Sequence, residues 1–246
     1  MASKEISKIA GSIKDSSMTV ALTGAGISTE SGIADFRSPG GIWSRFDPGI
    51  FTRKMLYGSP ELFYKKGIKL MEYIDGMGKA KPNQAHLVLA DLEKKGLLDS
   101  VITQNIDGLH LKAGSKKVLE IHGDLLDCYC IECGLKYGLK TLIKQVKAGV
   151  IPPTCNSCKG MLRPSIVLFG DMLPDCFHEA IKLVKKSEFL MVIGSSLEIS
   201  PANTLLDYAK KIAIINDQKT AFDDKASVII RDRASRALLS LLGILN

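Results

Sequence analysis

Short apolar runs rich in β-branched residues alternate along this chain with stretches of helical periodicity. Seven such runs stand at 18–22, 100–103, 118–121, 165–169, 189–193, 212–215 and 227–230. Between two of them, residues 83–95 follow Pro82, are apolar at helical spacing and end before Gly96. Strands that alternate with helices form a parallel sheet, because each parallel connection must cross one face of the sheet. The chain is therefore predicted to be an α/β protein with a doubly wound, Rossmann-like parallel sheet.

Two segments interrupt this alternation. Residues 38–80 show no strand pattern and are expected to form a helical insert, whereas residues 124–162 hold five of the six cysteines and are expected to contribute little to the core. The segments 1–37, 81–123 and 163–246 are assigned to the Rossmann-like domain. A chain of 246 residues can bury one large core together with a smaller inserted module.

The cysteines of the second segment predict a metal site. They form two C-x-x-C pairs separated by 21 residues: Cys130 with Cys133, and Cys155 with Cys158. Each pair turns two thiolates toward one point, and soft sulfur ligands suit Zn²⁺, whereas disulfides are disfavoured in a reducing compartment. Four thiolates leave no open coordination position, so a structural zinc in a small zinc-binding module is predicted. Cys128 and Cys176 are expected to be packing residues.

A glycine-rich loop, GAGIS at 24–28, directly follows the first apolar run. Such loops bring backbone N–H groups close to phosphate oxygens. The usual G-x-G-x-x-G fingerprint is incomplete, because Thr29 stands where the third glycine belongs. Nor does an acidic residue close a second strand about 20 residues later, where it would bind a ribose. The loop predicts a nucleotide site that differs from the site of a dehydrogenase.

Polar residues stand directly after several predicted strands. They are Gln104, Asn105 and Asp107 after 100–103, His122 after 118–121, Ser195 and Ser196 after 189–193, and Asn216 after 212–215. The carboxyl ends of parallel strands meet at one edge of a sheet, so these side chains are expected to share one crevice. His122 is the predicted general base, because it is the histidine at a strand end. His86, His110 and His178 are expected to be structural.

The net charge of +7 raises the question of nucleic-acid binding. The lysine pairs are scattered, however, and the cysteine-rich segment lacks interleaved aromatic and basic residues, so direct nucleic-acid binding is not expected. Residues 237–245 form an apolar stretch that is too short to span a membrane, and residues 1–16 lack the apolar core of a signal peptide. We therefore expect a cytoplasmic protein without membrane association.

Several motifs together resemble the sirtuins, a family of NAD-dependent protein lysine deacylases, in their short prokaryotic form. Besides the two C-x-x-C pairs, they are GAGIS (24–28), ADFRS (34–38), TQNIDGLH (103–110), IHGD (121–124), FGDMLP (169–174), GSSLEISPA (194–202) and IIN (214–216). Their joint presence in this order is far more specific than any single motif. Ala34, Asp171 and Ser195 depart from the family's usual proline, glutamate and threonine, and none of these changes removes a reactive group.

The resemblance implies NAD as co-substrate and a set of residues that bind it. These are Gly24, Ala25, Gly26, Thr29, Asp35, Phe36, Arg37, Gln104, Ile106, Asp107, Gly194, Ser195, Ser196, Asn216 and Asp232. By similarity, Ala25, Thr29 and Arg37 would line the phosphate and ribose path, and Phe36 would cover the ribose face that nicotinamide leaves. Asn216 would bind the adenine ribose.

The resemblance also implies the catalytic residues His122 and Asn105. His122 would take a proton from a ribose hydroxyl, and Asn105 would bind a ribose hydroxyl or an ordered water. Gln104 would contact the ribose, and Ile106 and Asp107 would hold the nicotinamide carboxamide.

An acetylated-lysine protein or peptide is the implied partner. It would bind as an added β-strand between residues 167–170 and 197–200, and Val167, Phe169 and Gly170 would contact it. Backbone pairing of this kind gives affinity with little sequence selectivity, so many protein substrates are expected.

A neutral acyl group is expected on that lysine. Sirtuins that remove acidic acyl groups carry a Tyr-x-x-Arg pair, and here Gly67 stands three residues after Tyr64. The implied products are nicotinamide, O-acetyl-ADP-ribose and free lysine. Two alternatives remain at this point: an NAD-dependent protein ADP-ribosyltransferase and a zinc-ribbon nucleic-acid-binding protein.

Overall fold

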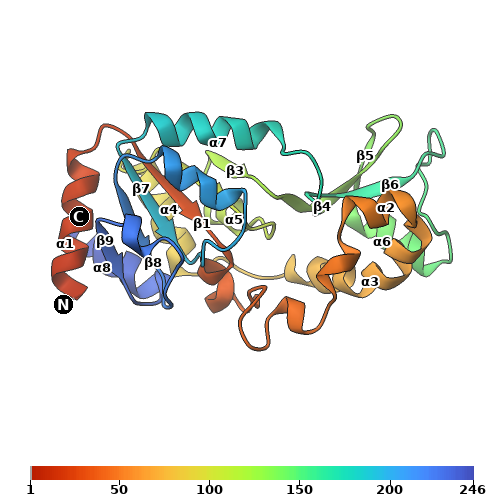
Figure 1. Cartoon of the computed structure of the whole chain (residues 1–246), viewed down its shortest axis with the longest axis horizontal. Coiled ribbons are helices and arrows are strands. Elements are labelled where there is room, and N and C mark those ends of the chain that lie inside the picture. The colour runs from red at the N-terminus through yellow and green to blue at the C-terminus, as the bar shows by residue number, and fades with distance from the viewer. Residues whose placement is uncertain (1) are drawn as a thin grey trace.

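The computed structural model describes residues 2–246 and shows a larger and a smaller lobe side by side (Figure 1). The larger lobe is built on a six-stranded parallel sheet of order β3-β2-β1-β7-β8-β9. Its strands are β1 (Thr19–Thr23), β2 (Ser100–Thr103), β3 (Val118–Glu120), β7 (Phe189–Ile193), β8 (Ile212–Ile215) and β9 (Val228–Ile230). The predicted doubly wound, Rossmann-like sheet is confirmed, and the strand order reverses between β1 and β7.

Helices cover both faces of this sheet. On one face lie α1 (Ala2–Asp15), α4 (Gln84–Lys94), α5 (Leu109–Ala113) and α8 (Ala234–Leu245), and on the other lie α7 (Asp175–Lys186) and the 3₁₀ helix η4 (Ala202–Tyr208). Side chains of a strand alternate between the two faces. In β7, for example, Phe189 and Met191 join the α1 side, whereas Leu190 and Val192 join the α7 side. Each strand is therefore apolar on both faces, as the continuous apolar runs predict.

The helix predicted over residues 83–95 is α4. Asn83 caps it by accepting the N–H of Ala85 on its side-chain oxygen (2.9 Å), and Gly96 follows with a left-handed φ of +70°. The Asn83 amide also donates to Ile27 O (2.7 Å), in the short helix η1 (Ala25–Ser31) that follows β1. The residue that caps α4 thus also holds the helix η1 that follows the glycine loop.

The smaller lobe combines both predicted inserts. Its antiparallel sheet, of order β5-β4-β6, consists of β4 (Gly123–Cys130), β5 (Lys136–Gly138) and β6 (Leu162–Ile166). Its helices are α6 (Leu139–Lys147) and, as predicted for 38–80, η2 (Ile42–Ser44), η3 (Pro48–Ile50), α2 (Arg53–Gly58) and α3 (Pro60–Met77). One apolar cluster joins Phe63 and Leu70 of α3 to Leu142 of α6 and Leu162 of β6. The two inserts therefore share one core, although they are far apart in the sequence.

One predicted strand belongs to a different sheet. The sequence places the run 165–169 in the parallel sheet, and this prediction is wrong: β6 ends at Ile166 and pairs antiparallel with β4, where Cys130 faces Leu162. A buried strand reads as a short apolar run in either kind of sheet, so the pattern alone does not identify its neighbour. The domain boundaries proposed from the sequence stay a prediction; Met1, the first residue of the 1–37 segment, lies outside the described residues.

The connection between β8 and β9 contains the short 3₁₀ helix η5 (Asp223–Lys225). Across residues 2–246, none of the helices combines the length and the apolar character that crossing a membrane requires.

Candidate active site

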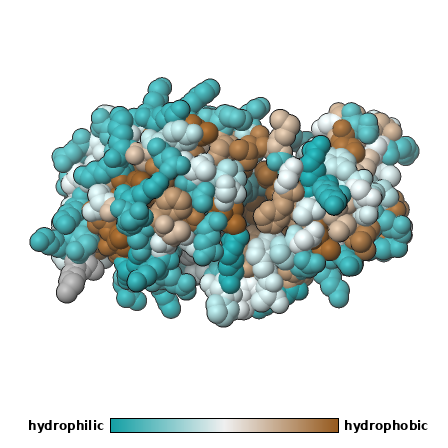
Figure 2. Space-filling view, in the orientation of Figure 1, coloured by the Kyte–Doolittle hydropathy of each residue, from teal (hydrophilic) through white to brown (hydrophobic). Residues whose placement is uncertain are grey.

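A cavity of about 790 Å³ lies at the carboxyl ends of the parallel strands. Figure 2 shows its opening as a hollow between the two lobes, with apolar side chains beside it. Its walls come from the loops after β1, β2, β7 and β8 of the larger lobe and from residues 35–51 and 166–173. This is the crevice where the strand order reverses, the place at which doubly wound sheets bind ligands.

The cavity brings together nearly all of the residues predicted for NAD, catalysis and substrate. They are Gly24, Ala25, Gly26, Thr29, Asp35, Phe36, Arg37, Gln104, Asn105, Ile106, His122, Val167, Phe169, Gly170, Gly194, Ser195, Ser196 and Asn216. Within the described chain, Asp107 and Asp232 are not among the lining residues. Asp107 lies buried beneath the cavity, and Asp232 pairs with Arg236 (3.3 Å) near the start of α8. Their roles in NAD binding stay predictions.

The sequence did not single out the aromatic and aliphatic wall of the cavity. Trp43, Phe51, Leu70 and Ile74 line it from the helical insert. The ring centroids of Phe36 and Trp43 lie 5.3 Å apart, and those of Trp43 and Phe51 lie 6.3 Å apart. The sequence offers one indication of this wall: Trp43 follows ADFRS closely, in the glycine-containing segment PGGIW (39–43). These side chains give the cavity an apolar wall in addition to the polar strand ends.

The glycine loop packs backbone to backbone on the loop after β7. The N–H of Gly26 donates to Gly194 O (2.8 Å), and a Cβ on Gly24 or on Gly26 would lie only 2.8 Å from that same oxygen. Gly194 has a φ of +61°, and a Cβ there would lie 2.3 Å from Ile27 N. Three glycines are therefore required for this close approach.

The N-terminus of η1 follows directly, because Gly24 is its N-cap and makes no side-chain cap. The first residues of η1 line the cavity, where a helix start favours phosphate oxygens. The N–H groups of Gly26 and Ile27 already donate to Gly194 O and Gly24 O, so among the first three residues of η1 the N–H of Ala25 is the one left for a ligand. The start of η1 suits phosphate groups, and the polar residues after the strands suit ribose hydroxyls. Together with the volume of the cavity, they fit a dinucleotide.

Polar side chains beneath the cavity form a continuous network. Asn105 donates from its amide to Gly24 O and to Ser28 Oγ (3.1 Å each), and Ser28 Oγ donates to Asp107 Oδ2 (2.7 Å). The other oxygen of Asp107 accepts the N–H of Leu109 (2.9 Å). Asp107 is therefore a hydrogen-bond acceptor on both oxygens, and Asn105 is held in one orientation.

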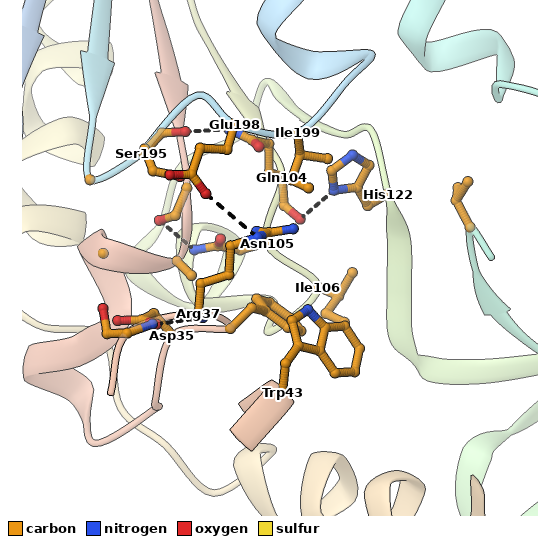
Figure 3. A pocket seen from close by; sticks show the side chains of 18 of the residues that line it. Asp35, Arg37, Trp43, Gln104, Asn105, Ile106, His122, Ser195, Glu198 and Ile199 are labelled. Atoms are coloured by element: carbon orange, nitrogen blue, oxygen red, sulfur yellow. Dashed lines mark hydrogen bonds and ion pairs between the residues drawn. The ribbon is translucent and has the colours of Figure 1, made fainter. Parts of the chain in front are cut away.

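His122 lines the same cavity, two residues after the end of β3. Its Nδ1 is 3.0 Å from Gln104 O, and Gln104 Nε2 in turn donates to Ser195 Oγ (2.9 Å), as Figure 3 shows. A carbonyl oxygen can only accept, so Nδ1 carries the proton and Nε2 keeps a free lone pair. Burial lowers the pKa of His122 below its ordinary value, and the hydrogen bond to Gln104 O partly offsets this shift. The ring is thus neutral and basic at neutral pH.

The segment after β6 is anchored to the helical insert. The N–H of Phe169 donates to Phe51 O (3.0 Å), and Phe169 O accepts the N–H of Arg53 (2.8 Å). Asp171 closes the turn by accepting the N–H of Leu168 (2.8 Å) and pairing with Arg163 (2.7 Å), whose side chain is buried. The Phe169 ring remains half-exposed at the cavity mouth. Both backbone polar groups of Phe169 are therefore already paired with the helical insert, which holds one edge of the predicted peptide site in place.

His86 and His110 are buried next to this network, as predicted for structural histidines. Their ring centroids lie 4.9 Å apart, His86 Nε2 lies 3.4 Å from Ser28 Oγ, and His110 Nε2 lies 2.9 Å from Thr23 Oγ1. Burial lowers the pKa of His86 to about 4 and that of His110 to about 3. Both rings are therefore neutral in the folded protein, whereas each gains a proton near pH 6.5 when the chain unfolds.

Replacing His86 with glutamine is expected to make stability less sensitive to acid. Below pH 6.5 the unfolded chain binds a proton at His86 that the folded chain does not bind, so the free energy of unfolding falls as the pH falls. One such proton changes the slope by about 1.4 kcal/mol per pH unit. Urea unfolding between pH 5 and 6 should show this difference for His86→Gln but not for the exposed His178→Gln. Equal slopes in all three proteins would contradict the buried, neutral state of His86.

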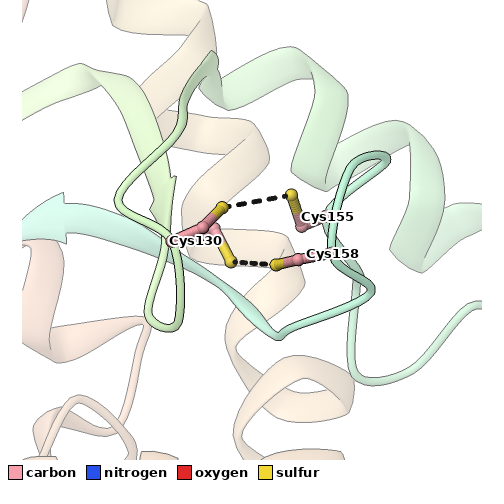
Figure 4. A group of neighbouring side chains, drawn as sticks. Cys130, Cys155 and Cys158 are labelled. Atoms are coloured by element: carbon pink, nitrogen blue, oxygen red, sulfur yellow. Dashed lines mark hydrogen bonds between the residues drawn. The ribbon is translucent and has the colours of Figure 1, made fainter.

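The four predicted zinc ligands meet at one point of the smaller lobe (Figure 4). All four sulfur atoms lie within 4.8 Å of one another, with Cys130 and Cys158 at 3.4 Å and Cys133 and Cys155 at 3.8 Å. Tetrahedral zinc with sulfur ligands at about 2.3 Å requires sulfur–sulfur distances of about 3.8 Å, so the cluster fits zinc. The four cysteines do not line the cavity within the described chain, which agrees with a structural metal.

The other two cysteines lie outside this cluster. Cys128 is buried, with Sγ directed at Gly138 O (3.7 Å), and Cys176 Sγ is directed at Glu120 O (3.6 Å). Burial raises the pKa of both thiols, so neither is a reactive thiolate. Tyr137 lies next to the cysteine cluster: its hydroxyl accepts the N–H of Asn156 and lies 3.1 Å from Cys155 Sγ, within hydrogen-bonding distance.

These features define a class: a dinucleotide-binding α/β enzyme with a neutral histidine base in its cavity and a separate structural zinc module. The model of the Sir2 family matches residues 24–201, and the chain belongs to this family.

Similar proteins agree over nearly the whole length. The NAD-dependent protein deacetylase 2 of Caldanaerobacter subterraneus is 48% identical over 241 residues, which cover 97% of this chain and 95% of the relative. An NAD-dependent protein deacetylase of Thermotoga maritima is 45% identical over 221 residues, covering 88% of each chain. A Sir2 structure with a p53 peptide and NAD⁺ superposes with a TM-score of 0.85 at 40% identity, covering 97% of this chain and 99% of the other. A Sir2 structure with a propionylated peptide has the same TM-score at 39% identity and covers 98% of this chain and 99% of the other.

Proposed function

We propose that this protein is an NAD-dependent protein lysine deacetylase. It transfers the acetyl group of a modified lysine to the ADP-ribose part of NAD and releases nicotinamide. The observation that carries the proposal is the free Nε2 of His122, which shares one cavity with the glycine loop while the zinc cluster lies elsewhere. The relatives named above as NAD-dependent protein deacetylases support it.

NAD supplies the ribose carbon to which the acetyl oxygen attaches when nicotinamide leaves. The chain's own residues position the reactants and move one proton. The side-chain amide of Asn105 donates to Gly24 O and Ser28 Oγ, which holds the side chain in one orientation. The side chain of Gln104 is held in the same way by its hydrogen bond to Ser195 Oγ. His122 accepts the proton of a ribose hydroxyl at Nε2, and Nδ1 keeps its proton on Gln104 O.

The apolar wall excludes water from this reaction. A weak nucleophile such as an amide oxygen needs exact positioning and a dry site, because water would otherwise capture the same carbon. Phe36, Trp43 and Phe51 supply an aromatic surface in the cavity wall, with neighbouring rings tilted against each other. Their place in the wall supports acyl transfer rather than simple hydrolysis of NAD.

A neutral acyl group fits the inner wall. Tyr64 is fully buried and donates its hydroxyl to Leu162 O, so it does not face an acyl group. Phe51, Leu70 and Ile74 line this part of the cavity. An acetyl group would be desolvated there at little cost, whereas a carboxylate would need a charged partner.

The two alternatives receive less support. An ADP-ribosyltransferase does not require a neutral base opposite the glycine loop, and a nucleic-acid-binding module does not require the polar strand ends. Neither explains why residues from both lobes converge on one cavity.

The direct test follows NAD turnover with an acetylated peptide. Nicotinamide, deacetylated peptide and O-acetyl-ADP-ribose should form in equal amounts, as measured by mass spectrometry. ADP-ribose attached to protein, without loss of acetyl groups, would favour the transferase and would contradict the proposal.

Replacing Asn216 with alanine is expected to raise the KM for NAD about two- to tenfold and to leave kcat nearly unchanged. Asn216 ends β8, donates its amide to Gln218 O (2.9 Å) and lines the cavity on the side away from His122. Contacts to the adenine ribose would be equal in the ground state and the transition state, so their loss affects binding alone. Steady-state kinetics should show this pattern, with Asn246→Ala as the control. A hundredfold fall in kcat at constant KM would contradict the assignment.

We also propose that the enzyme works in the cytoplasm, because unpaired cysteines placed to bind zinc are typical of proteins in a reducing compartment. Cell fractionation tests this; recovery outside the cytoplasmic fraction would contradict it.

A further inference from the structure

A single carboxylate projects into the cavity mouth from the loop after β7. Glu198 lines the cavity, and its side chain is 59% exposed. Its carboxylate lies 3.7 Å from Arg37 Nε, which reaches across from the opposite wall, as Figure 3 shows. Ion pairs with both partners this exposed are weak, so a cation of a bound substrate can replace Arg37.

Backbone groups of the two neighbours of Glu198 form hydrogen bonds within the described chain, whereas those of Glu198 do not. The N–H of Leu197 donates to Ser195 Oγ (3.2 Å), and Leu197 O accepts the amide of Asn203 (3.2 Å). Ile199 O accepts the N–H of Asn203 (3.1 Å). Among residues 2–246, no hydrogen-bond partner is found for the N–H or the C=O of Glu198. These groups are available to the backbone of an extended peptide.

We propose that Glu198 selects substrates with a lysine or arginine close to the acetylated lysine. The inference rests on the proposed function, and it adds the class of peptide that the enzyme prefers. A peptide strand paired with the Glu198 backbone places one of its side chains about 4.5–5.5 Å from the Glu198 Cβ. At that distance an ionised carboxylate attracts a cationic side chain and repels an acidic one.

The other charges near the mouth do not cancel this preference. Asp171 is neutralised by Arg163 (2.7 Å), and Arg53 lies 3.7 Å from Asp171 with its guanidinium over the ring of Tyr57. The chain as a whole carries a net charge of +7, which by itself favours acidic peptides. A preference for basic peptides must therefore arise locally, and Glu198 is the exposed acid on the predicted peptide edge.

The test uses acetyl-lysine peptides that are identical except at one flanking position. Four positions are varied one at a time: the two residues before the acetyl-lysine and the two residues after it. Each carries lysine, glutamine or glutamate in turn. With saturating NAD at low ionic strength, kcat/KM for wild type should favour lysine over glutamate by about three- to thirtyfold at one position at least. Glu198→Gln should remove this ratio, and Glu198→Lys should invert it. Glu179→Gln on the exposed face of α7 makes the same charge change away from the cavity and should leave the ratio unchanged.

Three outcomes would overturn the proposal. Equal kcat/KM for all peptides with wild type would remove the selectivity but leave the deacetylase function intact. An unchanged ratio in Glu198→Gln together with a raised KM for NAD would show that the pair with Arg37 serves only to close the NAD site. Absence of deacetylation with every peptide would overturn the proposed function, and the selectivity with it.

Discussion

Replacing His122 with alanine is expected to reduce deacetylation by about 10²–10⁴-fold, the usual effect of removing a positioned general base. Binding of NAD and of acetylated peptide should stay close to wild type, because the proton transfer follows the departure of nicotinamide. Exchange of free nicotinamide into NAD should therefore survive better than net deacetylation. The three activities should be followed in parallel on folded, zinc-replete protein.

His122→Asn sharpens this test. An asparagine amide can still donate to Gln104 O, as Nδ1 does over 3.0 Å, but it offers no base in place of Nε2. It should lose deacetylation as alanine does, whereas the exposed His178→Ala should behave as wild type. Activity near wild type in His122→Asn would show that the hydrogen bond to Gln104, and not a proton transfer, is what matters.

The pH profile provides an independent check. Since burial lowers the pKa of His122, its neutral form persists below the ordinary histidine value of about 6.5. The acid limb of kcat/KM should therefore lie below pH 6.5, with activity falling as the pH falls through the pKa of the folded protein. An acid limb above pH 7 would contradict a buried, neutral base.

The parallel strands could be predicted closely from the sequence. Residues 100–103, 189–193 and 212–215 are strands with the predicted bounds, because strands buried on both faces are continuous apolar runs between polar turns. The pairing of 162–166 could not be predicted, since its partner β4 is a strand with polar residues and a bulge that carries no clear pattern. Local sequence specifies a strand more strongly than it specifies the strand's neighbour.

The candidate site divides in the same way. Its polar half was predictable, because residues at the carboxyl ends of parallel strands must meet at one edge of the sheet. Its apolar half was not: Leu70 and Ile74 lie on the inner face of α3, and a helix that lines a cavity has the same periodicity as a helix that packs on a core. Glu198 was missed because its significance depends on Arg37, a residue far away in the sequence.

Replacing Cys155 with alanine is expected to abolish stoichiometric zinc binding and to unfold the smaller lobe. Zinc bound by peptide-sized modules contributes about 10–16 kcal/mol to their folding, more than the net stability of most domains. Buried Cys130 and Cys155 belong to the apolar cluster that also holds α3, α6 and Leu168, so loss of the metal should disorder residues 166–171 as well. Deacetylation should then fail even though the zinc is far from the chemistry.

Metal analysis, thermal unfolding and activity should be measured together on this variant. The matched control is Cys176→Ala, which removes a thiol outside the cluster and should keep both zinc and activity. Tyr137→Phe provides a graded case: it removes only the hydroxyl 3.1 Å from Cys155 Sγ and should speed the release of zinc to a chelator without emptying the site. If Cys155→Ala were zinc-free yet kept the thermal stability and activity of wild type, the metal would not support the fold. If it retained a full equivalent of zinc, Cys155 would not be a ligand, and the cluster in Figure 4 would need a different explanation.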